Sequence, residues 1–180
     1  MRNIIDFQIN QKTIFRVVGN DDFTSFSEVE IIYNMNNEII LFKDFLIEGI
    51  KVLRTTLYKA IESRLQTFDL GERKSMGFLW NDYCSKLNTG NQGVDDLVTP
   101  FHLWSTNSTL GFDTWIYNIS DKIFIEISPT YKWHFDELPG SNYITYDQFI
   151  SKYAPIDIFE IDKSTAKDWF KICEDTLSHL

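Results

Sequence analysis

Cysteine, proline and histidine are scarce in this 180-residue chain, which has two cysteines, four prolines and three histidines. Two cysteines cannot form the disulfide framework of a small secreted domain, and four prolines with eight glycines exclude collagen-like and low-complexity classes. The longest segment without Asp, Glu, Lys or Arg, Leu97 to Phe112, is too short and too polar to span a bilayer. Hydrophobic residues make up 43% and charged residues 24%. These values predict a single globular domain over residues 1–180.

The sequence also lacks the features of an exported protein. Asp6 lies where a signal peptide would begin its apolar core, so we expect a cytoplasmic protein that does not insert into a membrane. In a reducing cytosol, Cys84 and Cys173 are expected to be two unlinked, buried thiols.

Basic residues are few, and they are unevenly distributed. The chain has 26 acidic and 17 basic residues, a formal net charge of −9 and a pI near 4.7, which argues against a nucleic-acid partner. Residues 1–90 have 11 basic and 12 acidic side chains, whereas residues 91–180 have 6 basic and 14 acidic side chains and no arginine. This imbalance has two interpretations: it keeps the domain soluble and monomeric, or it steers a basic protein partner to the C-terminal half.

Hydrophobic periodicity predicts the main elements. Runs of β-branched residues at 13–18 and 28–33 predict an N-terminal antiparallel unit, and apolar residues spaced by three or four over about 43–66 predict a long amphipathic helix. A second helix is expected over 76–87. Two C-terminal helices are expected to start at capping boxes headed by Thr145 and Thr165. The predicted fold class is α+β, with an antiparallel sheet packed against the long helix and the C-terminal helices.

The clearest hairpin lies at 114–128, around a turn at Ser120 and Asp121. A two-residue turn pairs Trp115 with Glu126 and Tyr117 with Phe124 on one face, and it leaves isoleucines on the other face. The isoleucine face is expected in the core. The aromatic face has two possible fates: a helix covers it, or it remains open as an interaction surface.

No catalytic constellation is evident in the sequence. The three histidines share no spacing typical of metal ligands, Cys84 and His102 form only a weak candidate for a nucleophile and its base, and no phosphate-binding glycine pattern occurs. His134, Asp136 and Glu137 contain hard ligands but need others from elsewhere in the fold. We therefore expect no enzymatic activity, no cofactor, no metal site and no catalytic residue.

Aromatic residues are abundant, at 16% of the chain, and several lie next to acidic residues in the C-terminal half. Such a combination is typical of protein interfaces, although a sugar could stack on the same rings. The candidate partner-binding residues are Asp113, Trp115, Tyr117, Asp121, Phe124, Glu126, Trp133, Asp136 and Glu137.

The order of elements carries a family resemblance. Strands, one long helix, the acidic aromatic hairpin, then Tyr146, Phe149 and the run Tyr153-Ala154-Pro155, with Ala166 and Trp169 in a terminal helix, together resemble the immunity proteins of bacterial polymorphic-toxin and contact-dependent inhibition systems. The resemblance covers layout only and transfers no binding residue. It implies a single acidic domain that neutralises a cognate toxin, often a basic nuclease, by obstructing the active site of that toxin.

Three functions therefore remain open from the sequence. An immunity or inhibitor protein would bind a basic protein and would be monomeric when free. A ligand-binding or carbohydrate-binding module, or a regulatory domain, would use the aromatic residues in another way. An uncharacterised enzyme would show polar residues clustered in a pocket.

Overall fold

The N-terminal quarter of the chain forms a four-stranded antiparallel meander. The computed structural model describes residues 3–20, 22–34, 38–67, 70, 75–88, 96–105, 111–134 and 143–180. The first sheet has the order β1-β2-β3-β4, and the second, also antiparallel, has the order β5-β6-β7-β8. The strands are β1 Asn3–Asn10, β2 Thr13–Gly19, β3 Glu28–Asn34, β4 Glu38–Phe45, β5 His102–Ser105, β6 Phe112–Ile119, β7 Lys122–Pro129 and β8 Asp157–Ile161.

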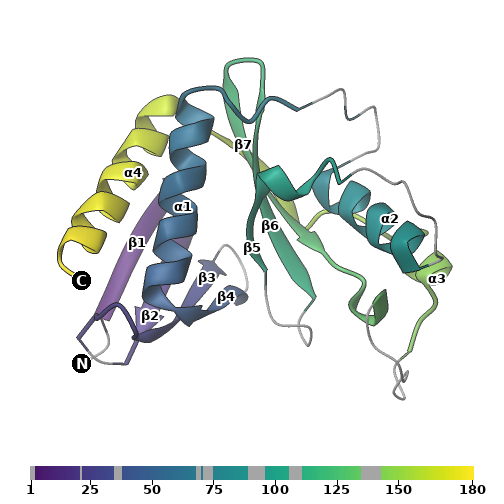
Figure 1. Cartoon of the computed structure of the whole chain (residues 1–180), viewed down its shortest axis with the longest axis horizontal. Helices are drawn as coiled ribbons and strands as arrows, with labels where there is room; N and C mark the ends of the chain where they lie inside the picture. Colours follow the sequence, from purple (N-terminus) through teal and green to yellow (C-terminus); the bar gives the residue numbers. More distant parts are fainter. Residues whose placement is uncertain are drawn as a thin grey trace.

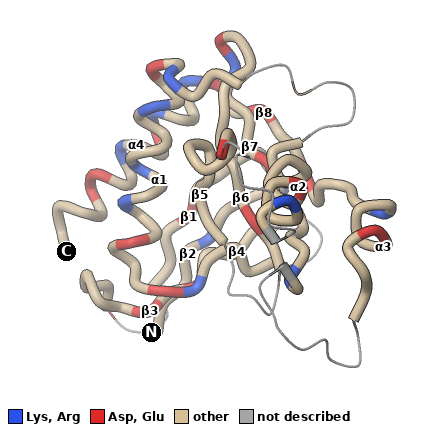
Figure 2. The backbone as a smooth tube through the Cα atoms, turned by 45° about the vertical axis from the view of Figure 1, so that its right-hand side comes forward, with Lys and Arg blue, Asp and Glu red and all other residues tan. Residues whose placement is uncertain are grey.

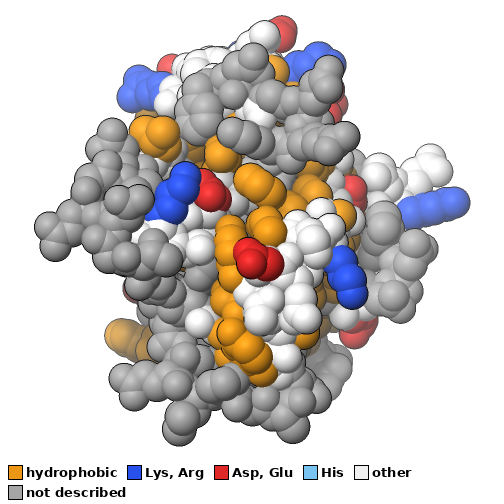
Figure 3. Space-filling view, turned by 90° about the vertical axis from the view of Figure 1, so that its right-hand side faces the viewer, with side chains coloured by type: hydrophobic (Ala, Val, Ile, Leu, Met, Phe, Trp, Pro, Cys, Tyr) orange, Lys and Arg blue, Asp and Glu red, His pale blue; other side chains and the backbone are white. Residues whose placement is uncertain are grey.

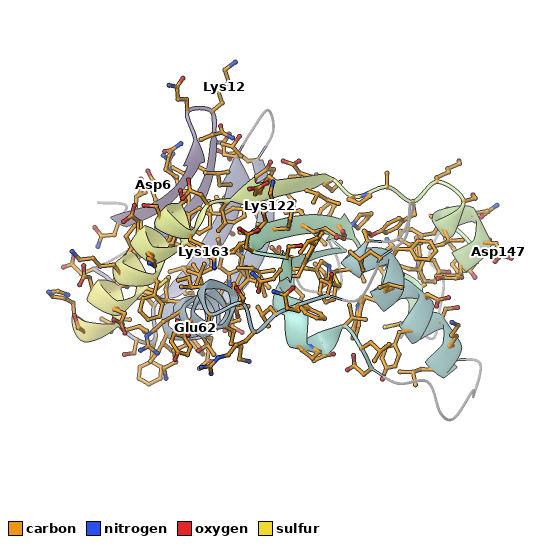
Figure 4. All side chains as sticks on the ribbon, turned by 90° about the horizontal axis from the view of Figure 1, so that it is seen from above. Asp6, Lys12, Glu62, Lys122, Asp147 and Lys163 are labelled. Carbon is orange, nitrogen blue, oxygen red and sulfur yellow. The ribbon has the colours of Figure 1, made fainter. Side chains whose placement is uncertain are left out.

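The helices lie at the two ends of the molecule (Figure 1). Among the described residues they are α1 Leu46–Ile61, α2 Met76–Asn88, α3 Tyr146–Ile150 and α4 Lys163–Ser178, with short 3-10 turns η1 Thr99–Phe101 and η2 Lys132–His134. Helices α1 and α4 pack side by side over the same face of the first sheet, whereas α2 and α3 lie beyond the second sheet (Figures 1 and 4). The α+β class predicted from the sequence is confirmed, with two antiparallel sheets instead of one.

One aromatic core joins both sheets. The ring of Phe15 on β2 lies 5.6 Å from Trp104 on β5, 5.8 Å from Phe159 on β8 and 5.6 Å from Trp169 on α4, measured between ring centroids. Alternating residues of the first three strands are buried against this core, as expected for a sheet with one covered face. The second sheet is covered on both faces, because α1 packs on one side of β6 and α2 on the other.

The hairpin prediction is confirmed residue by residue. Trp115 pairs with Glu126, Tyr117 with Phe124 and Ile116 with Ile125, around a two-residue turn in which Ser120 has φ 57°. The capping box of α3 is also present: Thr145 Oγ1 accepts from the Gln148 backbone N–H, and Gln148 Oε1 accepts from the Thr145 N–H.

Two helix boundaries differ from the prediction. Helix α1 begins at Leu46, because residues 43–45 extend β4 and pair with β3. It ends at Ile61, two residues before Ser63 takes the left-handed conformation with φ 55°. Helix α4 begins one turn before the predicted cap. Its N-cap is Asp162, whose carboxylate accepts from the Thr165 backbone N–H and thereby lowers the pKa of Asp162.

Candidate functional site

The aromatic face of the hairpin is covered by α2, so it is not an open surface. Trp115 is fully buried, and its ring centroid lies 5.9 Å from that of Trp80 on α2. Tyr117, on the same face of β6, is 2% exposed. The expectation that these two side chains contact a partner is therefore wrong for the folded protein. Asp113 and Glu126 are buried in the same layer, so two acids of the C-terminal half cannot contribute to a contact surface.

Glu126 is fully buried and anchors the first turn of α2. Its Oε2 accepts from the Met76 N–H at 3.0 Å, and its Oε1 accepts from the Gly77 N–H at 2.9 Å. The hydroxyls of Ser128 and Tyr117 also donate to this carboxylate, the second at 3.4 Å. A carboxylate at a helix N-terminus satisfies free amide donors and interacts favourably with the helix dipole. Glu126 thus holds α2 against β7.

Two further residues position α2. The buried amide of Asn81 donates to the carbonyls of Gly77 and Pro129 at 2.7 and 3.0 Å, and its oxygen accepts from the Tyr131 N–H at 2.7 Å. At Gly77, a Cβ atom would lie 2.3 Å from the Ser128 Cβ, so only glycine permits this approach of helix and strand. Together, these contacts fix the segment that follows β7 on α2.

That segment belongs to a half-exposed group of rings, which we call the aromatic cluster: Tyr131, Trp133, Tyr143, Tyr146, Phe149 and Tyr153. Tyr131 lies at its centre, with ring centroids 5.5 Å from Trp133, 5.5 Å from Tyr146 and 5.4 Å from Phe149. Trp133 also contacts Tyr143 at 5.5 Å. Figure 3 shows hydrophobic side chains exposed in a band on this side of the molecule, with charged side chains beside them.

The exposure of these rings differs from centre to edge. Tyr131 is 6% exposed and donates its hydroxyl to the Ile144 carbonyl at 2.8 Å, whereas Tyr143 is 45% exposed and Trp133 is half-buried. Burial raises the pKa of Tyr146 to about 12, and the charges of Asp82 and Asp147 add to this effect. The two carboxylates therefore lie close enough to the cluster to act on it electrostatically.

The ammonium group of Lys132 packs on one ring of the cluster. Lys132 Nζ lies 4.2 Å from the centroid of the Trp133 ring, which is well within the range of a cation–π interaction. In the described part of the chain, no carboxylate lies within salt-bridge distance of Lys132. The ring of Trp133 thus attracts a positive charge, and no carboxylate among the described residues lies at salt-bridge distance to assist it.

The other predicted contact residues are dispersed. Phe124 is half-buried and stacks on Tyr117 at 5.9 Å, and Asp121 is exposed at the hairpin turn. Trp133 follows the opposite end of β7, which at strand geometry is about 25 Å from Asp121. The remaining two, Asp136 and Glu137, lie outside the described residues. Of the predicted contact residues that the structure describes, only Trp133 therefore belongs to the aromatic cluster.

Sequence reasoning missed the other five rings of the cluster as site residues: Tyr131, Tyr143, Tyr146, Phe149 and Tyr153. For Tyr146 and Phe149 the signal was their i, i+3 spacing in a short helix, which places both rings on one face.

Of the pair considered for thiol chemistry, His102 contacts a carboxylate and Cys84 is buried. His102 Nε2 lies 3.2 Å from Asp113 Oδ1, and Thr130 donates to the other oxygen of this carboxylate. Cys84 is buried, and burial raises the pKa of its thiol to about 12, with the nearby charges of Asp113 and Asp96 adding to this effect. A thiol with such a pKa stays protonated at neutral pH and is a poor nucleophile. Among the residues that the structure describes, no three His, Cys, Asp or Glu side chains form a group able to hold a metal ion.

Both thiols are expected to be unreactive in the native state. Cys84 and Cys173 are unlinked and buried, as predicted, and burial raises each thiol pKa from 9.0 to about 12. Thiol titration of native protein at pH 8 should detect none, and titration in denaturant should detect two per chain. Because the folded-state pKa is raised, the associated stability is complete below pH 9 and is lost as the pH rises toward 12. Fast labelling of a native thiol, or fewer than two after denaturation, would contradict this prediction.

Charged side chains of both signs occur along the described chain. Lys and Arg positions lie on α1 and α4 and also on strands and loops, and Asp and Glu positions are interspersed among them (Figure 2). Within the described residues, no helix is long and apolar enough to cross a membrane. Comparison with protein-family models, curated proteins and solved structures finds no match for this chain.

Proposed function

We propose that this protein is an inhibitor of the immunity type, which binds and neutralises a basic protein, such as a toxin domain, through the aromatic cluster. The observation that carries this proposal is the Trp133 ring, half-exposed and in contact with the Lys132 ammonium at 4.2 Å. A ring that attracts one cation in this way is suited to an arginine or lysine side chain of a partner.

The rest of the cluster supports the same partner. Tyr and Trp side chains anchor protein interfaces because they bury a large area at a low cost in conformational entropy. The hydrogen bonds of Tyr131 with Asn81 and with the Ile144 carbonyl fix the cluster in place, so its side chains lose little conformational entropy on binding. The carboxylates of Asp82 and Asp147 lie beside it, and the net charge of −9 favours the approach of a basic protein.

A carbohydrate could stack on the same rings, but it would not respond to charge. Raising the ionic strength to a physiological value shortens the Debye length to about 8 Å. Association with a basic protein should then slow, whereas dissociation should change little. Sugar binding would be indifferent to this change.

The test uses Trp133→Leu and the protein encoded next to this one, since an immunity protein is expected to neighbour its toxin. If that protein binds, we expect Trp133→Leu to raise the Kd about 30-fold, mainly through faster dissociation, because the substitution removes an interface anchor. Surface plasmon resonance measures both rates. Survival of cells that express the partner together with each variant measures neutralisation.

Tyr58→Leu is the matched control, because Tyr58 is an exposed ring on α1, far along the chain from the cluster. It should bind as the unchanged protein does, and both variants should keep their melting temperatures within a few degrees. Equal binding by the Trp133 and Tyr58 variants would reject the aromatic cluster as the contact surface. Failure of the unchanged protein to bind or protect would reject the proposed inhibition of that neighbour.

A further inference from the structure

The first sheet has one face that no described helix covers. Helices α1 and α4 both pack on its inner face, and Figure 4 shows the two helices together on one side of these strands. On the other face, three rows of side chains cross the four strands in register. The first row is Ile4, Val18, Glu30 and Lys43, the second is Asp6, Arg16, Ile32 and Ile40, and the third is Gln8, Ile14, Asn34 and Glu38.

This outer face is hollowed and has an apolar centre. A depression of about 560 Å³ is lined by eight of the outer-face side chains and by Gly19, Asn20, Glu28 and Val29; the eight are Ile4, Arg16, Val18, Glu30, Ile32, Asn34, Glu38 and Lys43. Val18 and Ile32 lie at its middle in adjacent rows, and Ile4 at the edge is 51% exposed. Exposed apolar side chains surrounded by charged ones are typical of interaction surfaces.

The charges on the two sides of this apolar centre follow one pattern. Arg16 forms a salt bridge with Asp6 at 2.8 Å, and Glu38 lies close enough to add to the rise in the Arg16 pKa that Asp6 causes. Lys43 forms a salt bridge with Glu30 at 2.9 Å, and Glu28 likewise adds to the rise in its pKa. Arg16 and Lys43 thus each lie near two carboxylates, so negative charges on this face outnumber positive ones.

The surplus carboxylates are Glu28 and Glu38. Within the described residues, neither forms a salt bridge. Glu38 accepts one hydrogen bond, from the side-chain amide of Asn34 at 3.4 Å. A carboxylate without a salt bridge thus lies on each side of Val18 and Ile32, and an uncharged or acidic surface placed over it would be costly.

We propose that the outer face of the first sheet binds a cationic protein segment that presents a basic side chain on each side of an apolar one. The apolar side chain packs on Val18 and Ile32, and the two basic groups pair with Glu28 and Glu38. Such an arrangement buries apolar area and leaves no carboxylate unpaired at the interface.

This surface is separate from the aromatic cluster. Figure 4 places Asp147 of α3 and Asp6 of β1 at opposite ends of the molecule. The two surfaces are tested with different variants and probes, so failure of one leaves the other standing.

The probe is the synthetic peptide acetyl-Arg-Ser-Val-Ser-Arg-amide, which in an extended conformation places two arginines and the valine on one side. When the peptide is titrated into 15N-labelled full-length protein at low salt, the amide signals of β1 to β4 should shift. Binding of the peptide should be weaker at physiological salt. The acetyl-Glu-Ser-Val-Ser-Glu-amide peptide should cause no such shifts. Shifts of equal size with both peptides would overturn the charge selectivity, and shifts confined to α2 and α3 would overturn the surface.

The double variant Glu28→Gln, Glu38→Gln should bind the arginine peptide with an affinity at least fivefold lower than that of the unchanged protein. The matched control is Glu62→Gln with Asp168→Asn, which removes the same charge from exposed positions on the helix side. Both should keep the melting temperature of the unchanged protein. Equal weakening in both double variants would show an effect of net charge alone and overturn the proposal. Dimerisation in sedimentation that the Glu28 and Glu38 changes abolish would overturn it in favour of a second copy of this chain.

Discussion

Replacing Glu126 by Ala is expected to lower the free energy of unfolding by about 3 to 5 kcal/mol. The substitution removes the acceptor of the Met76 and Gly77 backbone amides and leaves both donors buried at the start of α2. It also removes the acceptor for the Ser128 hydroxyl and opens a cavity in a layer where Glu126 is fully buried. Urea denaturation followed by circular dichroism measures the loss.

Glu160→Ala is the control for this experiment, because Glu160 lies on the neighbouring strand β8 and forms only an exposed salt bridge with Lys122. Its loss should cost at most about 1 kcal/mol. Glu126→Gln keeps one acceptor oxygen and should fall between the two alanine variants. If Glu126→Ala and Glu160→Ala lower the free energy of unfolding by the same amount, the carboxylate of Glu126 does not hold α2 in place.

Local patterns predicted the elements whose geometry is decided by neighbouring residues. The hairpin register followed from a two-residue turn, because a turn of that length leaves one alignment that buries the isoleucine face. The α3 capping box likewise needs only Thr145 and Gln148. In both, the interacting residues are close in sequence.

Four strands were missed: β1 and β4 pair with the two predicted N-terminal strands, whereas β5 and β8 pair with the hairpin. β5 and β8 are short, with four and five residues, and they form as strands because β6 and β7 offer free edges to pair with. The α1 periodicity continued through residues 43–45, although pairing with β3 makes these residues a strand. Tertiary pairing overrides a local helical pattern in such segments.

The candidate site was predictable only in part for the same reason. Trp133 was expected in a contact surface and is half-exposed in the aromatic cluster. Glu126 was expected beside it, but its partners at Met76 and Gly77 lie about 50 residues earlier in the chain. In a strand of alternating apolar and polar residues, a carboxylate is expected to be exposed unless the backbone amides that donate to it in the folded protein are known. The helix that supplies them is specified by another part of the sequence.

The second large effect is expected at Trp115, where Trp115→Ala should lower the free energy of unfolding by about 3 to 5 kcal/mol. The side chain is fully buried between the Trp80 ring at 5.9 Å and the His102 ring at 4.9 Å, so truncation leaves a large cavity under α2. The loss should appear as a lower melting temperature of the free protein, before any partner is added. A partner-binding defect at an unchanged melting temperature would instead show that Trp115 is exposed in solution.

Trp115→Phe separates lost packing from lost hydrogen bonding at the same position. The Trp115 Nε1–H is buried, and among the residues that the structure describes it has no hydrogen-bond partner. Phenylalanine removes this unsatisfied donor together with part of the ring, so the two changes act on the stability in opposite directions. We therefore expect Trp115→Phe to cost about 1 to 2 kcal/mol, well below the alanine variant. A Trp115→Phe loss as large as that of Trp115→Ala would mean that the indole N–H makes a hydrogen bond on which the packing of α2 depends.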